Sequence, residues 1–132
     1  MSNELPPCGR WAGYYLYGHG GSRHRMKLTL VFAGNGAIDG DGVDDVAAFV
    51  ITGRFVVPTG AASWTKAYVG MHRVEYSGLY CRNAICGDWT LMGQSGGFWI
   101  WPESETQLEE AVEEVKTREP VRMSRELDPI VR

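Results

Sequence analysis

Apolar and polar residues alternate along most of the chain between residues 11 and 101. The run from Arg25 to Phe32 shows the pattern cleanly, because every second residue from Met26 onward is apolar. Successive side chains of a strand point to opposite faces, so this alternation predicts strands with one buried face. Clusters of glycine, asparagine and proline separate the runs. The predicted strands cover residues 11–17, 25–32, 37–42, 46–56, 64–68, 72–81, 85–91 and 98–101.

Short connections between these strands favour an antiparallel meander, in which each strand pairs with the next. Eight strands are also enough to close a small barrel, which is either filled by side chains or holds one small ligand. Closure pairs the last strand with the first and removes both open edges. The sequence therefore predicts an all-β fold, an eight-stranded antiparallel up-and-down barrel of the calycin-like kind, over residues 11–102.

The composition changes after Pro102. Residues 104–107 fit a capping box, and an apolar stripe then recurs at helical spacing among glutamates, at Leu108, Ala111, Val112 and Val115. We expect a C-terminal amphipathic helix over residues 103–117. Residues 118–132 have prolines, mixed charges and no period, which predicts a flexible tail. Residues 1–10 are expected to form an N-terminal arm.

The most distinctive stretch is a hairpin predicted over residues 64–78. A three-residue loop at residues 69–71 sets a register with Tyr68 opposite His72. One face of this hairpin then carries Trp64, Lys66, Tyr68, His72, Val74 and Tyr76. With one residue from a later strand, the candidate ligand-binding set is Trp64, Lys66, Tyr68, His72, Tyr76 and Trp89.

The predicted inward face alternates large aromatic residues with glycines. The aromatic members are Trp11, Tyr15, Phe32, Phe49, Phe55, Trp64, Tyr68, Tyr76, Trp89 and Phe98. Alternation of large and small residues fills the taper of a small barrel, but aromatics opposite glycines also leave a slot for a flat ligand. The pattern is compatible with both a filled interior and an interior with a ligand slot.

Two side chains of the hairpin decide what chemistry is available. A buried Lys66 needs a partner or loses its proton, and a histidine between tyrosines, such as His72, can act as acid, base or ligand anchor. The structural alternative is that both lie at the mouth of the barrel in ordinary hydrogen bonds. No nucleophile and base occur in a recognisable local motif, so no catalytic residue is predicted.

An acidic loop over residues 39–45 resembles a calcium loop in composition. Its weak candidate ligands are Asp39, Asp41, Asp44 and Asp45. The loop lacks the EF-hand spacing and the distal bidentate glutamate, and aspartate with glycine is also typical of ordinary turns. We therefore predict neither a metal site nor a cofactor.

Charge is distributed unevenly along the chain. Residues 1–102 carry 8 Lys/Arg and 7 Asp/Glu, whereas residues 103–132 carry 5 and 9. A nearly neutral body with an acidic tail has no electrostatic footprint for nucleic acid. No apolar run is long enough to cross a membrane, and the N-terminus lacks the pattern of a signal peptide. We expect a cytoplasmic protein without nucleic-acid or membrane partners, whose three cysteines stay reduced.

Two cysteines flank a predicted tight turn. A two-residue turn at Asn83 and Ala84 places Cys81 directly opposite Cys86 on the outward face. We expect such a pair to oxidise easily in air.

Several short motifs together resemble a family of small uncharacterised bacterial β domains. They are W-x-G-x-Y from Trp11, G-V-D-D from Gly42, F-x-I-x-G from Phe49, K-x-Y-x-G-x-H-x-V-x-Y-x-G from Lys66, I-x-G-x-W from Ile85 and G-G-F-x-I-W-P from Gly96. The resemblance covers residues 11–102 and implies a compact β domain without an established activity. The topology is also similar to avidin-like and lipocalin-like barrels, without a biotin-binding motif.

Three functions are compatible with these patterns. The leading hypothesis is a non-enzymatic module that binds a small apolar or aromatic ligand or another protein. The alternatives are a barrel enzyme that uses His72 and Lys66 as acid/base or Schiff-base residues, and a purely structural filled barrel. Trp99 and Trp101 are expected to face outward and to pack against the C-terminal helix, within a monomer or across a homodimer.

Overall fold

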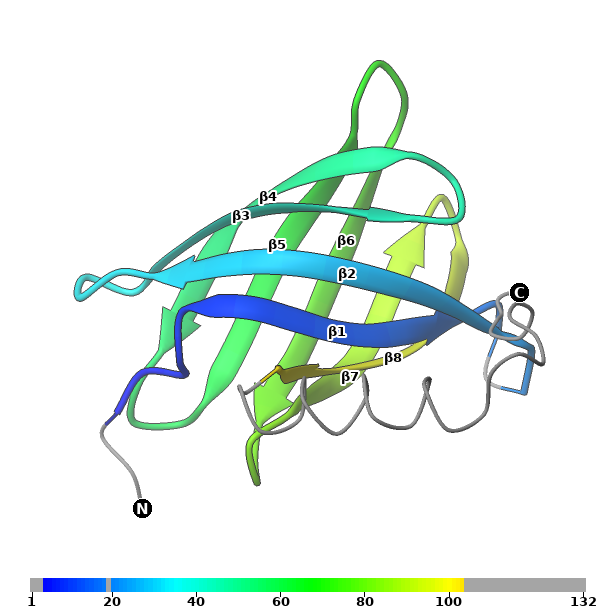
Figure 1. Ribbon diagram of the computed structural model, residues 1–132. Coiled ribbons are helices and arrows are strands. Elements are labelled where there is room, and N and C mark those ends of the chain that lie inside the picture. The colour runs from blue at the N-terminus through cyan, green and yellow to red at the C-terminus, as the bar shows by residue number, and fades with distance from the viewer. Residues whose placement is uncertain (1–3, 19, 104–132) are drawn as a thin grey trace, which may run out of the picture.

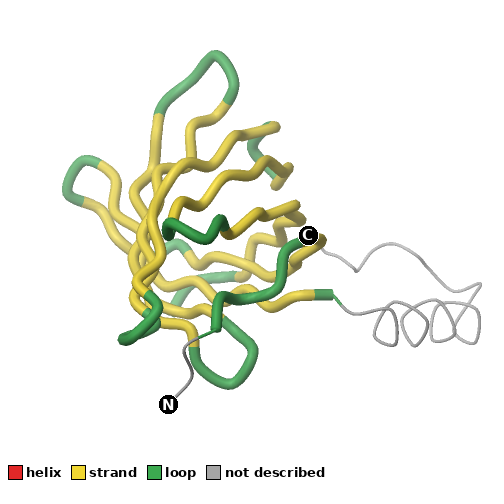
Figure 2. Tube along the Cα trace, turned by 90° about the vertical axis from the view of Figure 1, so that its left-hand side faces the viewer, coloured by secondary structure: helices red, strands yellow, loops and turns green. Residues whose placement is uncertain are grey.

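The protein is described by a computed structural model that covers residues 4–18 and 20–103. This part of the chain consists of strands and short loops (Figures 1 and 2). The strands are β1 (Gly9–Leu16), β2 (Arg23–Phe32), β3 (Ala37–Asp44), β4 (Ala48–Val56), β5 (Ala61–Tyr68), β6 (Arg73–Tyr80), β7 (Ile85–Leu91) and β8 (Gln94–Pro102). The predicted C-terminal helix and tail lie outside the described residues, apart from residue 103.

The eight strands form a closed antiparallel barrel in chain order, which confirms the predicted up-and-down meander. The barrel closes where β8 pairs with β1, with Phe98 opposite Tyr15 and Ile100 opposite Gly13. The central hairpin of β5 and β6 has the predicted register, because Lys66 lies opposite Val74. All strand edges are therefore paired within the molecule.

The two ends of the barrel differ in their loops. The loops β1–β2, β3–β4, β5–β6 and β7–β8 lie at one end, which we call the loop rim (Figure 1). The other end carries the loops β2–β3, β4–β5 and β6–β7 together with the N-terminal segment. At that end Leu5, Val57 and Tyr80 pack against the core.

The interior is filled by side chains. All ten aromatic residues predicted to face inward are buried. Trp64 lies opposite Gly53, where an added Cβ would be 2.5 Å from the Trp64 Cβ, and Phe98 lies 3.1 Å from the corresponding position at Gly78. The aromatic rings thus occupy the space beside the glycines, as in small barrels packed by alternating large and small residues.

Two predicted turns were wrong by one or more residues. The β6–β7 turn is formed by Arg82 and Asn83, both at positive φ, so Leu79 rather than Cys81 lies opposite Cys86. A two-residue hairpin turn of this type needs positive φ at both central positions, and Asn83 can supply one of them in either window. The β7–β8 loop is likewise a two-residue turn, at Met92 and Gly93, and β8 begins earlier than predicted.

Candidate functional site

The central feature of the interior is a buried ion pair near the loop rim. The Lys66 ammonium on β5 donates a hydrogen bond of 2.7 Å to Oδ2 of Asp44, at the end of β3. The two side chains are 1% and 0% exposed. Charges this deeply buried are tolerated only when they are paired and hydrogen-bonded. The pair thus links two strands that are not neighbours in the barrel.

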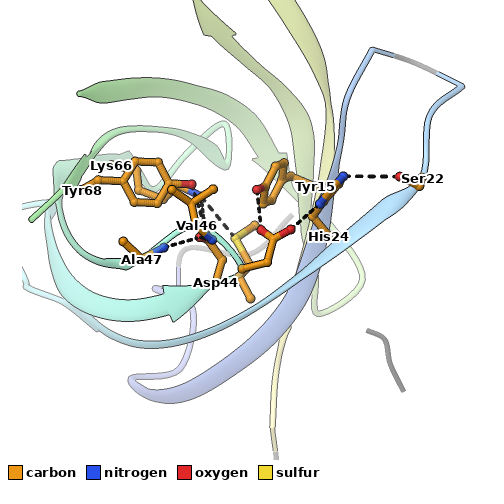
Figure 3. Close-up of polar contacts among 10 residues, drawn as sticks. Tyr15, Ser22, His24, Asp44, Val46, Ala47, Lys66 and Tyr68 are labelled. Atoms are coloured by element: carbon orange, nitrogen blue, oxygen red, sulfur yellow. Dashed lines mark hydrogen bonds and ion pairs between the residues drawn. The ribbon is translucent and has the colours of Figure 1, made fainter. Parts of the chain in front are cut away.

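Asp44 has hydrogen-bond donors at both of its carboxylate oxygens (Figure 3). Oδ2 accepts from Lys66 and also from the Tyr68 hydroxyl at 2.7 Å. Oδ1 accepts from the backbone N–H of Val46 at 2.9 Å and, more weakly, of Ala47 at 3.4 Å. The same side chain therefore neutralises the buried lysine and shapes the β3–β4 loop.

The rest of the Lys66 ammonium faces aromatic rings. Its Nζ lies 4.6 to 5.0 Å from the ring centroids of Tyr15, Phe49, Tyr68 and Tyr76. The negative face of an aromatic ring attracts a cation, and the attraction strengthens where water is excluded. The four rings thus complete a cage around the ammonium group.

A second carboxylate, Asp45, continues this network toward solvent. The Tyr15 hydroxyl donates to its Oδ1 at 2.7 Å, and Nδ1 of His24 lies 2.5 Å from its Oδ2. The His24 ring stacks on Tyr15 with centroids 5.0 Å apart. Asp45 thereby connects β1, β2 and the β3–β4 loop at the rim.

Burial shifts the titration of this cluster. Desolvation lowers the pKa of Lys66 below its ordinary value, and the Asp44 carboxylate partly offsets this effect. Burial also raises the pKa values of Tyr15, Tyr68 and Tyr76 well above the ordinary value. The hydrogen bonds from Tyr15 to Asp45 and from Tyr68 to Asp44 raise these pKa values further, because a nearby carboxylate disfavours a phenolate.

These phenols predict alkaline unfolding. A phenol whose pKa is raised by folding contributes stability that is complete below the unfolded pKa of about 10 and is lost as the pH rises above it. The lowered pKa of Lys66 has the opposite effect on the free energy of unfolding. It lowers stability below the unfolded lysine pKa of about 10.5, and this loss disappears as the pH rises, but only one group contributes it. We expect Tyr15, Tyr68 and Tyr76 to ionise only as the protein unfolds.

Tyrosinate absorbance and circular dichroism, followed together through an alkaline titration, test this expectation. Three of the six tyrosines, Tyr15, Tyr68 and Tyr76, are buried around the Lys66 ammonium. The three caged phenols should titrate in the same transition that removes the β-sheet signal. Ionisation of all six before any loss of structure would contradict the burial of these hydroxyls.

The structure separates the two residues of the enzyme hypothesis. Lys66 is enclosed in the core, whereas His72 lies on the exposed β5–β6 loop with its ring 5.0 Å from that of Tyr68. A Schiff-base lysine must be free of its proton and reachable by a carbonyl compound. Lys66 instead donates a hydrogen bond to the Asp44 carboxylate and faces four aromatic rings.

The other candidate ligand residues also contact one another. Trp64 stacks on Tyr76 with ring centroids 5.5 Å apart and planes 12° apart. The Trp89 indole N–H donates to the backbone carbonyl of Leu16 at 2.7 Å. Five members of the predicted set are therefore buried together, and His72 contacts them through Tyr68 from the exposed β5–β6 loop.

The four candidate metal ligands do not converge. Asp39 and Asp41 lie exposed on the outer face of β3, whereas Asp44 points inward and Asp45 binds Tyr15 and His24. Residues 39, 41 and 44 thus project to opposite faces of the same strand. Within residues 4–18 and 20–103, no three His, Cys, Asp or Glu side chains are grouped for a metal ion.

The sequence reasoning missed the partner of Lys66. The sequence analysis predicts Asp44 only as a weak calcium ligand. Its position has the same parity as Ile38, whose apolar side chain marks the inward face of the strand. An inward carboxylate and an inward lysine in one barrel are a signal for a buried pair. That parity would have identified Asp44.

Comparisons with protein-family models, curated protein sequences and solved structures gave no match to this chain. The resemblance to small bacterial β domains therefore stays a prediction. Among the residues that the structure describes, no helix is long and apolar enough to span a membrane.

Proposed function

We propose that the protein is a non-enzymatic interaction module that binds a partner protein through the loop rim. The observation that carries this proposal is the distribution of exposed apolar side chains among the loops. Every loop of the rim has at least one, and together these are Tyr17, Val46, Val69, Met71 and Met92. Among the described loops of the opposite end, none has an exposed large apolar side chain.

Exposed apolar groups that gather at one end of a barrel are typical of a protein-binding surface. Met92 is 94% exposed in a two-residue turn, and Met71, in the longer β5–β6 loop, is 55% exposed. Methionine side chains are flexible and polarisable, so they adapt to the surface of a partner. The rim therefore has the chemistry of an adaptable apolar contact.

The buried network supports the same proposal because it holds the β3–β4 loop of the rim in place. Asp44 and Asp45 tie the β3–β4 loop to Lys66 and Tyr68 on β5 and to Tyr15 on β1. A buried ion pair contributes little net stability but specifies geometry in some proteins. A rigid rim loses less conformational entropy when it binds.

A photocrosslinking experiment in the producing cells tests the proposal. A benzophenone amino acid replaces Met92 in the full chain, and its matched control replaces Arg82. Both residues occupy the first position of a two-residue hairpin turn, but at opposite ends of the barrel. We expect a discrete crosslinked protein species from position 92 that is absent from position 82, and that is lost when Val69 and Met71 are changed to serine.

Equal crosslinking at both positions, or none at position 92, would contradict the rim as the binding surface. Native mass spectrometry of the purified chain separates this proposal from an internal ligand site. The packed interior predicts the mass of the chain alone, 14.7 kDa. A retained small molecule would favour the ligand-binding alternative.

A further inference from the structure

The outer surface of β8, β1 and β2 combines basic and aromatic side chains. Strand register places Trp99 beside Tyr14 and Tyr14 beside Arg25. Two residues further along the strands, Trp101 lies beside Ala12, and Ala12 lies beside Lys27. We call this surface the basic–aromatic face, and its members are Arg10, Tyr14, Arg23, Arg25, Lys27, Trp99 and Trp101.

Charge on this face differs from that of the whole molecule. The described residues carry eight Lys/Arg and eight Asp/Glu and are therefore neutral in sum. The face holds four of those cations but only one carboxylate, Glu103, which lies 3.9 Å from Arg10. Asp41 on β3 and Asp88 on β7 lie at its edges. The nearly neutral net charge predicts no polyanionic partner. It is a sum over all faces of the barrel, so it does not reveal this local cluster of cations.

The aromatic members form a platform beside the cations. Trp99 is 47% exposed. The guanidinium of Arg23 lies 4.4 Å from the centroid of the Tyr14 ring, and Tyr14 packs edge-to-face against Trp101 at 6.2 Å. These contacts hold Tyr14 and Trp101 in place, and within residues 4–18 and 20–103 the Trp99 ring is exposed for stacking.

We propose that the basic–aromatic face binds single-stranded nucleic acid. Proteins that bind single strands combine a positively charged track for the backbone with aromatic side chains on which bases stack. Arg23, Arg25 and Lys27 are alternate residues of β2, so they form a row spaced about 6.6 Å apart. This row is separated from the tryptophans of β8 by one strand, β1, so a phosphate backbone along β2 would have bases directed toward β8.

A pocket at the lower end of the face adds polar recognition. It has a volume of about 170 Å³, and its lining consists of Arg10, Trp11, Lys27, Leu28, Thr29, Asp41, Gly42 and Glu103. Its mixture of donors and carboxylate acceptors suits the hydrogen-bonding edge of a base better than a second phosphate. The basic–aromatic face is less suited to binding a membrane surface, because it lies along strands rather than on protruding loops.

Fluorescence anisotropy of labelled short oligodeoxythymidylate and oligouridylate with the full-length protein tests the inference. We expect saturable binding whose logarithmic salt dependence has a slope of about −2 to −3, corresponding to three or four phosphate contacts at roughly −0.7 each. Binding should quench tryptophan fluorescence, and this quenching should be lost in Trp99→Ala.

Two charge-reversal variants locate the site. Arg25→Glu combined with Lys27→Glu should weaken binding at least about 10-fold and flatten the salt dependence. The matched control is Arg54→Glu combined with Arg82→Glu, which makes the same change in net charge on other parts of the barrel and should bind like the wild type. Trp99→Ala should weaken binding about 10-fold with little change in the salt slope.

Absence of saturable binding at low salt would overturn the inference, as would equal effects of the two charge-reversal variants. Binding that is insensitive to Trp99→Ala would show only unspecific attraction between charges, and this result would also overturn the inference. So would binding to phosphatidylglycerol vesicles without binding to the oligonucleotides. Because the crosslinking test uses Met92 on the loop rim, either proposal can fail without the other.

Discussion

Replacing Asp44 by alanine is expected to lower the free energy of unfolding by about 3–5 kcal/mol, the usual cost of breaking a buried ion pair by removing one partner. The change leaves the Lys66 ammonium without its counter-ion inside a dry core. It also removes the acceptor for the Tyr68 hydroxyl and for the N–H of Val46. We expect the loss mainly from the stranded charge, because an unpaired buried ion costs more than an unpaired neutral donor.

Chemical denaturation of Asp44→Ala, Lys66→Met and the double variant measures this effect. The double variant should be more stable than the sum of the two single losses predicts, since it removes both buried charges. A matched control is Asp41→Ala, because Asp41 lies on the outer face of the same strand. Additive losses would mean that Lys66 and Asp44 do not depend on each other, which would contradict the ion pair as the organising contact of the rim.

Replacing Trp64 by alanine is expected to cost about 3–5 kcal/mol, as large aromatic truncations in protein cores do. Trp64 is 3% exposed, stacks on Tyr76 and meets the ring of Phe98 at 5.4 Å. The residue opposite it on β4 is Gly53, which has no side chain to fill the space that the indole leaves. The cavity should therefore persist rather than collapse.

Thermal and chemical unfolding of Trp64→Ala and Trp99→Ala form a matched test. The same substitution removes an indole from the inner face in the first variant and from the outer face in the second. We expect a large loss of stability only for Trp64→Ala. Unchanged melting of this variant would show that Trp64 does not belong to the core.

The alternation of residues allowed much of the barrel to be predicted without the structure. Parity placed Trp64, Tyr76 and Trp89 inside and Trp99 outside, because the two-residue period of a strand is a local property. The β5–β6 loop and its register were also local, since a short loop leaves few ways for the flanking residues to pair. Closure of β8 onto β1 followed from the number of strands.

Turn details were less predictable because several two-residue windows compete within one loop. The turn lies at Arg82 and Asn83 instead of Asn83 and Ala84. As a result, the residue opposite Cys86 on β6 is Leu79 and not Cys81. Side-chain chemistry does not distinguish these windows sharply, since each contains Asn83. In the structure the Cys81 N–H donates to the Ala84 carbonyl, which closes the turn around Arg82 and Asn83.

The alternating pattern by itself determined that this chain is a meander of eight strands with an aromatic inner face, because strand periodicity and turn residues act over a few positions. Only the tertiary structure decided that Lys66 pairs with Asp44, that His72 stays outside, and that the aromatic rings fill the barrel. These outcomes depend on distances between residues far apart in the chain. They are set when the barrel closes and each buried charge must find a partner.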